Sequence, residues 1–441
     1  MGFSEWKEVK LGEVANVLSG YGFKSKDFRD YGIPVIKIKN IVPPYVTLDE
    51  VQYVSQELSD ERNRYKIKYG DILISLTGSN VNQFASAVGK VGRVKINKEM
   101  LLNQRVGKFE ILDENIYNLD FLYYSISTED MHYKLAINAG GAANQANISP
   151  SLIKSMDLPC PSICEQKAIV AILSPLDDKI ELNNLIIKTL EEIEQTIFKS
   201  WFIDFEPFKD KKFEDSDIGS IPEGWRIGTL GELISDTLSG DWGKEMSQGN
   251  FTEEVTCIRG ADIPEIASGK KGKPATRFIL KKNLEKKQLS AGQIIIEISG
   301  GSPTQSTGRT ALITEELVTR SVKPLICTNF CRALSLKKNS YSTFLYSMLQ
   351  YLYKINLFFQ YENGTTGIKN LDTNNLFNKY QIIIPTDEIM VEYEAVFSTL
   401  IKSIYKNGSQ SDKLLVIRNT ILPKLMRGEI RVPMEGVEMN G

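Results

Sequence analysis

Short apolar runs that end in polar, glycine-containing loops occur twice along the chain, in the same order. The first series opens at Trp6 (WKEVKLGEVANVLSG) and the second opens at Trp225 (WRIGTLGELISDTLSG), 219 residues later. Each series continues with two strand-like runs, at 35–41 and 69–79 in the first and at 256–263 and 291–302 in the second. A repeat of this length predicts a duplicated domain, not a solenoid unit.

The two series also end in the same way. FLYYSI at 121–126 corresponds to FLYSML at 344–349, and a polar glycine loop and a short proline-closed strand follow in both. The order of runs predicts an α+β chain with two similar α/β domains. Two related domains usually mean two related ligands, or two parts of one ligand, and duplication for stability alone is the alternative.

A helical stretch follows each series, with apolar residues at alternating spacings of four and three. This spacing is typical of a coiled-coil seam, on which a polar residue such as Asn183 fixes the register. The first seam contains Leu176, Ile180, Asn183, Ile187, Leu190, Glu194, Ile197 and Trp201, and the second contains Ile389, Tyr393, Val396, Leu400, Leu414, Ile417 and Ile421. We expect two long antiparallel helices, the second interrupted at Gly408; the alternative is that each helix packs only on its own domain.

Charge is distributed unevenly, although the whole chain has a net charge of only −2. Residues 151–215 carry 8 basic and 13 acidic side chains, whereas residues 216–380 carry 20 basic and 16 acidic ones. A protein that wraps DNA unaided usually has a stronger basic surface. If this chain binds DNA, partner subunits are therefore expected to supply part of the electrostatic attraction.

The composition indicates a globular protein with several domains. The 441 residues suit two or three domains, and no run approaches the ~18 apolar residues that a membrane-spanning helix needs. The first residues contain no apolar signal region, so we expect a cytoplasmic protein without membrane contact. The five cysteines have neither disulfide-framework nor usual zinc spacings, and we expect buried or incidental thiols.

Catalytic patterns are missing from the sequence. His132 is the only histidine, and no nucleophile elbow, P-loop or dinucleotide-binding glycine pattern accompanies it. The tetrapeptide Val42-Pro43-Pro44-Tyr45 is similar to the motif of DNA amino-methyltransferases, but Val42 cannot accept the required hydrogen bond, so we interpret it as a turn. Asp204 and Glu206 lack a metal or histidine partner, and we expect them at a helix end or a subunit contact.

Polar residues follow the apolar runs at corresponding places in the two series, with different identities. Side-chain donors and acceptors read base edges, whereas Lys and Arg on phosphates set the position of the protein. The candidate DNA contacts are Tyr21, Lys24, Lys26, Lys37, Lys39, Asn40, Thr77, Ser79, Asn80, Asn144 and Gln145 in the first series, with Lys90 and Arg93 for phosphates. In the second series they are Trp242, Lys244, Arg259, Asp262, Ser302, Thr304, Gln305, Thr365, Thr366 and Lys369, with Arg309 for phosphates.

Several segments resemble the specificity subunits of type I restriction-modification systems. The similar segments are LDDKIELNN…FKSWFIDFEPF in the centre, the opening W-x-x-x-x-L-G-E, the loop GGAANQANISP and the C-terminal LPKLMRGEIRV. The resemblance implies target-recognition domains at 1–155 and 216–379, separated by helical spacers at 156–215 and 380–441. The expected spacer and docking residues are Leu176, Ile180, Asn183, Ile187, Trp201, Asp204, Leu400, Leu414 and Ile421.

The resemblance also implies a non-catalytic subunit that reads a bipartite DNA site and docks two methyltransferase subunits and restriction subunits. S-adenosylmethionine, ATP and Mg²⁺ are implied only for those partners, so we expect no cofactor in this chain. A specificity module of another DNA-modification or phage-defence complex, and a duplicated protein-binding scaffold without DNA recognition, are the alternatives.

Overall fold

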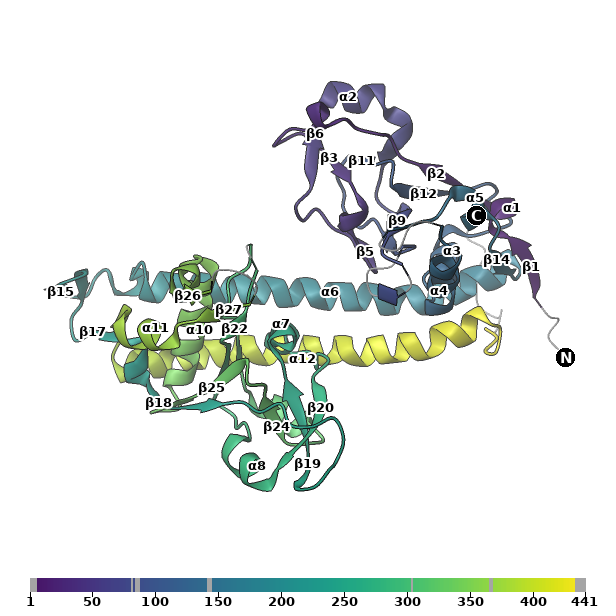
Figure 1. Ribbon diagram of the computed structural model, residues 1–441. Helices are drawn as coiled ribbons and strands as arrows, with labels where there is room; N and C mark the ends of the chain where they lie inside the picture. The colour runs from purple at the N-terminus through teal and green to yellow at the C-terminus, as the bar shows by residue number, and fades with distance from the viewer. Residues whose placement is uncertain are drawn as a thin grey trace. The chain divides into compact units, whose positions relative to one another are not determined.

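The computed structural model describes residues 6–80, 82–83, 88–140, 145–302, 304–364 and 368–432. The chain divides into two compact units: unit 1 comprises Met1–Asp177 and Val416–Gly441, and unit 2 comprises Asp178–Leu415. Each unit contains one of the two repeats, together with parts of two long helices, α6 (Ile163–Phe202) and α12 (Asp387–Met426) (Figure 1). We refer to the repeat that precedes α6 as the first domain and to the one between α6 and α12 as the second domain.

The first domain is built on two sheets. One sheet has the order β2-β12-β8-β10-β5-β4 and the other the order β6-β3-β11-β7. Their strands are β2 (Ala15–Ser19), β12 (Val106–Ile111), β8 (Ile72–Ser75), β10 (Val91–Arg93), β5 (Tyr45–Val46), β4 (Ile41–Val42), β6 (Gln52–Val54), β3 (Ile33–Ile36), β11 (Met100–Leu102) and β7 (Lys66–Ile67). The described part of the domain also contains two strand pairs, β1 (Lys7–Lys10) with β14 (Asp157–Cys160) and β9 (Thr77–Gly78) with β13 (Ala146–Asn147). Its α-helices are α1 (Leu11–Val14), α2 (Gln56–Glu61), α3 (Leu119–Ile126), α4 (Glu129–Ile137) and α5 (Pro150–Lys154).

The second domain repeats this plan. Its sheets have the orders β18-β25-β21-β23 and β20-β19-β24. The strands are β18 (Ile234–Ser239), β25 (Cys331–Leu336), β21 (Ile294–Glu297), β23 (Thr310–Leu312), β20 (Ala275–Leu280), β19 (Phe251–Ile258) and β24 (Leu325–Cys327). The other strands form the pairs β17 (Arg226–Thr229) with β28 (Gln381–Ile384) and β22 (Ser299–Gly300) with β27 (Lys369–Leu371), and the hairpin β15 (Phe213–Ser216)–β16 (Gly219–Pro222). The strand β26 (Glu362–Asn363) also pairs with β27. The α-helices are α7 (Ile263–Ala267), α8 (Lys281–Lys287), α9 (Glu315–Arg320), α10 (Tyr341–Lys354) and α11 (Thr373–Lys379).

The strand pairings confirm the α+β duplication that the sequence predicts. The parallel pair β3–β11 corresponds to the parallel pair β19–β24, and the antiparallel pair β1–β14 corresponds to β17–β28. Two glycines at the same place show how closely the backbones agree. A Cβ on Gly20 would lie 2.2 Å from the carbonyl oxygen of Leu102, and one on Gly240 would lie 2.0 Å from that of Thr328, so neither position accepts a side chain.

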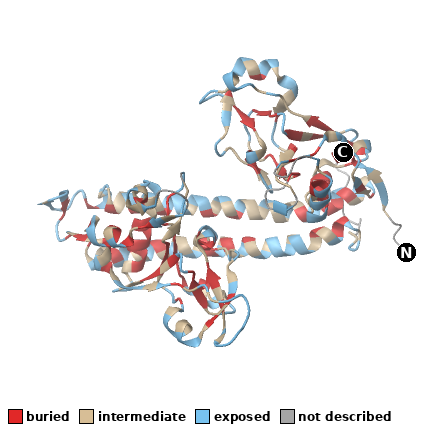
Figure 2. Ribbon diagram, viewed as in Figure 1, coloured by how far each residue is buried: buried red, intermediate tan, exposed pale blue. Residues whose placement is uncertain are grey.

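The long helices pack antiparallel within each unit. In unit 2, Asn183 donates to Gln410 at 3.0 Å, and Glu194 accepts a hydrogen bond from Tyr393. Residues further along α6 therefore contact residues nearer the start of α12, as antiparallel helices do. Each helix has 40 residues, about 60 Å at 1.5 Å per residue. In unit 1, Leu173 of α6 and Leu422 of α12 enter the core of the first domain. Buried residues of unit 2 gather on its sheets, on α10 and along the start of α12 (Figure 2).

Part of the predicted helix seam is wrong. Asn183 and Ile187 are buried, and Leu176, Ile180, Trp201, Leu400, Leu414 and Ile421 are half-buried. However, Val396 is 37% exposed and Ile417 is 48% exposed, while Phe397 and Ile404 are buried instead. A straight α-helix drifts against a strict seven-residue repeat, and packing on the domains selects the neighbouring positions.

The predicted interruption at Gly408 is also wrong, because α12 continues through it. A Cβ at position 408 would lie 2.3 Å from the carbonyl oxygen of Ser268. The glycine therefore allows the turn after α7 to approach the helix backbone. A glycine in a helical pattern can mark either a helix end or a close contact with another backbone, and the sequence alone does not distinguish the two.

Candidate nucleic-acid interface

In the first domain, the pairing of β9 with β13 brings two of the predicted recognition loops together. Thr77 lies opposite Asn147 and Gly78 lies opposite Ala146, so the segment from Thr77 to Asn80 runs beside Gln145. Ser79 and Asn80 are half-buried and Gln145 is exposed. The side chain of Asn80 accepts a hydrogen bond of 3.0 Å from the backbone N–H of Asn82. Asn144 lies outside the described residues.

The corresponding loops of the second domain meet through β22 and β27. Gly300 lies opposite Lys369, which places the Ser302–Gln305 loop beside the start of β27. The Ser302 hydroxyl accepts hydrogen bonds from the backbone N–H groups of Thr304 (3.3 Å) and Gln305 (3.0 Å), and the side chains of both are exposed. Lys369 forms an ion pair with Glu362 at 2.7 Å. Thr365 and Thr366 lie outside the described residues.

A second group of candidate residues in the first domain surrounds the loop after β2. The Tyr21 ring lies under the Arg62 guanidinium at 4.6 Å, and its hydroxyl accepts a hydrogen bond from Arg62 at 3.3 Å. Lys24 and Lys26 are exposed. Lys37 lies 3.9 Å from the Phe28 ring, and its burial, followed by the charge of Lys39, lowers its pKa. Lys39 is exposed and forms an ion pair with Glu50 at 3.0 Å.

The equivalent loop of the second domain carries Trp242 and Lys244. Trp242 is 37% exposed, and the Arg277 guanidinium lies 3.7 Å from its ring. Arg277 itself is mostly buried and reaches Glu245 at 3.1 Å. The stacking fixes the indole in place, so the loop presents a rigid aromatic edge beside the exposed Lys244.

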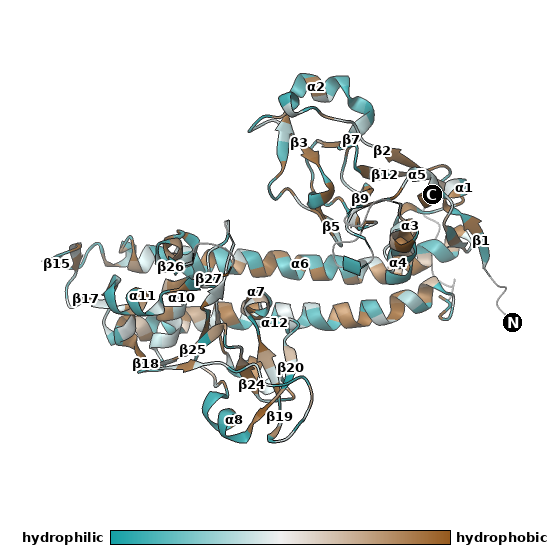
Figure 3. Cartoon of the chain, in the orientation of Figure 1, coloured by the Kyte–Doolittle hydropathy of each residue, from teal (hydrophilic) through white to brown (hydrophobic). Residues whose placement is uncertain are grey.

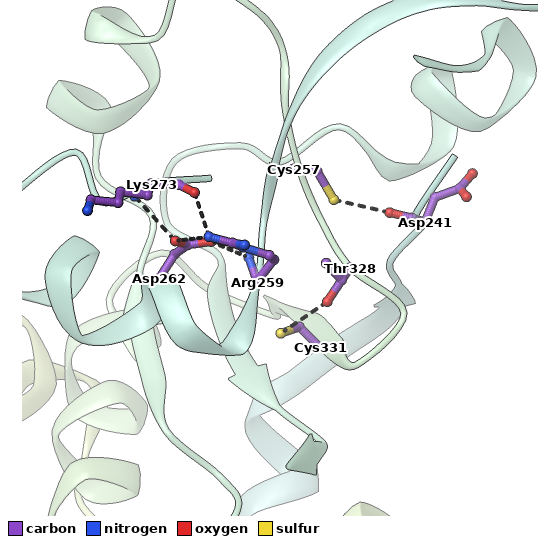
Figure 4. A network of polar contacts seen from close by, with 7 residues as sticks. All are labelled: Asp241, Cys257, Arg259, Asp262, Lys273, Thr328 and Cys331. Atoms are coloured by element: carbon purple, nitrogen blue, oxygen red, sulfur yellow. Dashed lines mark hydrogen bonds and ion pairs between the residues drawn. The ribbon is translucent and has the colours of Figure 1, made fainter. Parts of the chain in front are cut away.

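Asn40 and Asp262 are structural residues and are not available to bases, contrary to the sequence-based expectation. Asn40 is fully buried and accepts the backbone N–H of Lys37 at 3.0 Å. Asp262 is 3% exposed, accepts the backbone N–H of Arg259 at 3.0 Å and binds its guanidinium through two hydrogen bonds (Figure 4). Both side chains close the same short 3-10 turn, which explains why this position is polar in both domains. Arg259 is half-buried in the resulting network, with a further hydrogen bond of 2.6 Å to the carbonyl of Lys273.

Two of the three residues proposed for phosphates have intramolecular partners. Arg93 is 8% exposed, stacks on the Tyr123 ring at 4.3 Å and pairs with Asp120 at 3.0 Å. Arg309 makes two hydrogen bonds, of 2.9 and 2.6 Å, to the buried carboxylate of Glu297. Lys90 is half-buried. Both arginines therefore stabilise their domain in this structure, because a charged side chain near the interior requires an opposite charge.

Within the described ranges, no group of three or more His, Cys, Asp or Glu side chains could hold a metal ion, and no helix is long and apolar enough to cross a membrane. The ring of His132 lies 3.1 Å from the Val88 carbonyl oxygen. All five cysteines are free thiols, and burial raises the pKa of Cys257 and Cys331 to about 12. Cys257 donates to the Asp241 carbonyl at 3.2 Å (Figure 4).

Sequence reasoning missed three features of this surface. Arg62 and Arg277 support the two loops that carry Tyr21 and Trp242, but each is more than 30 residues away from its loop in the chain. The third is the lysine-rich segment around α8, which local counting of charge could have found. Residues 270–287 contain eight basic side chains and one acidic side chain.

Comparisons with known proteins agree with the duplicated architecture. Residues 3–192 and 222–411 each match the family model of the type I restriction modification DNA specificity domain. The chain is 29% identical to the type I restriction enzyme MjaIX specificity subunit of Methanocaldococcus jannaschii, over 97% of this chain and 94% of that protein. It is 24% identical to the HindI specificity subunit of Haemophilus influenzae, over 97% and 100%. The crystal structure of the type I restriction-modification S subunit from M. genitalium shares the fold, with a TM-score of 0.56, 17% identity and 96% coverage of both chains.

Proposed function

Because this chain belongs to the family of type I restriction modification DNA specificity domains, we propose that each of its two domains reads one half of a bipartite DNA sequence. The chain is a non-catalytic specificity subunit, and it works with DNA and with modification and restriction subunits. Methylation, ATP-driven cleavage and the S-adenosylmethionine, ATP and Mg²⁺ that they require belong to those partners.

The observation that supports two separate readers is one scaffold with two different sets of loop side chains. At the junction of β9 and β13 the first domain presents Ser79, Asn80 and Gln145. The second domain presents Thr304 and Gln305 at its β22–β27 junction, beside Lys369, whose ammonium group is paired with Glu362. Hydroxyl, amide and ammonium groups recognise different base edges, and each good contact contributes ~1–3 kcal/mol of discrimination. The same backbone with different donors and acceptors is what reading two different half-sites requires.

We propose the long helices as the docking surface for two modification subunits. In unit 2, Leu182, Leu185 and Ile193 of α6 are 49%, 56% and 42% exposed, on the side of the helix away from the buried Asn183 and Ile187. Exposed apolar residues along a helix are typical of a protein contact. The segment that contains this surface is acidic, since residues 151–215 carry net charge −5. A negative charge repels DNA and is compatible with a protein partner. Asp204, exposed just beyond α6 and paired with Lys199, lies on this segment.

A domain exchange tests the proposal. Residues 1–155 are replaced by the corresponding residues of a relative with a different target, and the chain is assembled with its modification subunits. Methylated positions are then mapped by sequencing DNA that the complex has treated.

We expect one half of the recognised sequence to change and the other half to stay. The matched exchange of residues 216–379 should change only the second half. If both halves changed in either exchange, the domains would not read independently. A complex without any sequence preference would indicate a protein-binding scaffold instead.

A further inference from the structure

The two domains carry opposite charges on a helix at the same place in the fold. In the first domain, α2 follows β6 and has the sequence QELSDE, with three acidic and no basic side chains. In the second domain, α8 follows β20 and has the sequence KKNLEKK, with four lysines and one glutamate. The surrounding residues 270–287 carry net charge +7, whereas residues 216–380 as a whole carry 20 basic and 16 acidic side chains, a net charge of +4. Without this segment the second domain would have a net negative charge.

Three of the four lysines of α8 are exposed to solvent. Leu284 packs against the cluster formed by Val255, Cys257, Ile279 and Ile326. Lys281, Lys282 and Lys286 are exposed; at 100° per residue, Lys282 and Lys286 lie about 160° around the helix from Leu284, and Lys281 lies about 60° from it. Within the described part of the chain none of the three has an ion pair, and Figure 3 shows α8 as predominantly hydrophilic.

The counterpart region of the first domain neutralises part of its own basic charge. Lys66 forms ion pairs with Asp60 at 3.2 Å and with Glu99 at 3.1 Å, and Arg62 donates a hydrogen bond to the Tyr21 hydroxyl. Near α2, Lys66 and Arg62 therefore have intramolecular partners, and Arg64 is an exposed basic residue beside the acidic helix.

Two hydrogen bonds attach α8 to the predicted reading loop of the second domain. Asn283 donates to the carboxylate of Asp241 at 2.6 Å, and Lys287 donates to the carbonyl oxygen of Gly240 at 2.8 Å. Trp242 follows directly on that loop. The exposed lysines are consequently part of the same rigid lobe as the aromatic edge that faces solvent.

We propose that α8 is a phosphate-backbone anchor, through which the second domain holds DNA more strongly, and with less dependence on sequence, than the first domain. The proposal rests on the proposed function, and it names Lys281, Lys282 and Lys286 as the anchor. The lysines contact phosphates as mobile point charges, while the loop from Gly240 to Lys244 reads bases. The first domain, with an acidic helix at this place, depends on its base contacts and on partner subunits.

Salt dependence measures the anchor directly. Each phosphate neutralised by a protein cation contributes about −0.9 to the slope of log affinity against log salt. Three contacts therefore contribute about −2.7, which is a roughly 40-fold larger loss of affinity between 50 and 200 mM salt. The triple variant Lys281→Gln, Lys282→Gln, Lys286→Gln, assembled with the modification subunits, should lose this part of the slope on both target and unrelated duplexes.

Two matched variants serve as controls. Lys337→Gln, Lys354→Gln, Lys379→Gln makes the same change of charge on exposed lysines near α10 and α11, at the other end of the second domain from α8 (Figure 1), and should keep the wild-type slope. Replacement of the three α8 lysines by Arg should also keep it, because the charge stays.

An unchanged slope in the α8 variant, an equal change in the control, or loss of subunit assembly by the α8 variant would overturn the anchor. These outcomes are separate from the proposed function, which fails only if the wild-type complex does not prefer its mapped duplex. The slope on unrelated DNA can still be measured in that case.

Discussion

The two units connect their domain to the long helices with different polar residues at the same place. In unit 1, Tyr124 of α3 donates to Asp177 at 2.9 Å, and Arg418 of α12 pairs with Asp177 at 3.3 Å. In unit 2, the hydroxyls of Ser347 on α10 and Tyr393 on α12 both donate to the carboxylate of Glu194 on α6, and the Tyr393 hydrogen bond is 2.9 Å long. The helices α6 and α12 both have 40 residues and start 224 residues apart, so Glu194 corresponds to Arg418 and Asp177 corresponds to Ile401.

The comparison shows that duplication preserved the backbone while the polar contacts were rearranged. An acidic residue of α6 accepts hydrogen bonds in both units, but among the described residues only unit 1 pairs it directly with a cation. In unit 2 the carboxylate has neutral donors, and burial raises the pKa of Glu194 above its ordinary value. Each junction is thus complete only with its own set of residues, and residues exchanged singly between the units should be poorly tolerated.

The largest effect is expected from Glu194→Arg, which places the unit 1 cation in unit 2 without its acidic partner. An uncompensated buried charge should lower the free energy of unfolding of unit 2 by about 3–5 kcal/mol. Urea unfolding followed by tryptophan fluorescence reports on unit 2, because three of the four tryptophans, Trp201, Trp225 and Trp242, belong to it.

A triple variant sharpens this test. Adding Ile401→Asp and Ser347→Tyr to Glu194→Arg rebuilds the unit 1 set within unit 2, and should recover part of the lost stability. If the triple variant were no more stable than the single one, the two junctions would not be equivalent.

A smaller loss is expected in unit 1 from Asp177→Ala. The change leaves the Tyr124 hydroxyl and the Arg418 guanidinium without their acceptor, at a cost of about 1–3 kcal/mol. Hydrogen exchange at the amides of α3 should become faster, while exchange in α10 of unit 2 stays unchanged. The exposed Lys167→Ala on the same helix is the control, with an effect within about 0.5 kcal/mol.

The pH dependence of unit 2 should differ from the usual behaviour of carboxylates. Because the pKa of Glu194 is higher in the folded chain than its ordinary 4.5, the folded state holds the proton over a wider pH range. This contribution to stability is fully present below pH 4.5 and is lost as pH rises through the folded pKa. Urea midpoints of the wild type and Glu194→Gln between pH 4 and 8 measure it: the variant should lack this fall, and parallel curves would contradict the assignment.

The smallest effect is expected from Asn183→Leu. Asn183 is fully buried between the helices, and its side-chain oxygen has no hydrogen-bond partner within the described residues. An apolar residue there should raise the stability of unit 2 by up to about 1 kcal/mol, because a polar seam residue maintains register at the expense of stability. Thermal unfolding measures the gain, and a clear destabilisation would show that the Asn183–Gln410 contact stabilises the fold.

The sequence predicts the architecture well because duplication leaves a long-range signal. The corresponding runs at β3 and β19, and at β8 and β21, were identified from apolar residues alone, and the structure places them in equivalent sheets. The seam of α12 was less predictable, since Val396 and Phe397 are both apolar and only packing against the domain decides which is buried.

The sequence indicates candidate loops for the site, and these stay a prediction; it does not tell which of their side chains face solvent. Polarity at Asn40 and Asp262 was interpreted as base recognition, yet both side chains close a turn. A local side-chain cap and a solvent-facing donor have the same residue types, so composition does not distinguish them. Arg93 and Arg309 illustrate the same limit, because their partners Asp120 and Glu297 are identified only by the folded structure.

The division of the chain also has a consequence for biosynthesis. Unit 2 is a continuous stretch, Asp178–Leu415, whereas the core of unit 1 includes Leu422, Leu425 and Met426 from the end of α12. On the ribosome, the first domain emerges before the second, but its hydrophobic core stays open until residues 422–426 have been synthesised. Of the two domains, the one that is synthesised first is therefore completed last, and a premature stop before Leu422 would damage the folding of a domain encoded more than 250 codons upstream.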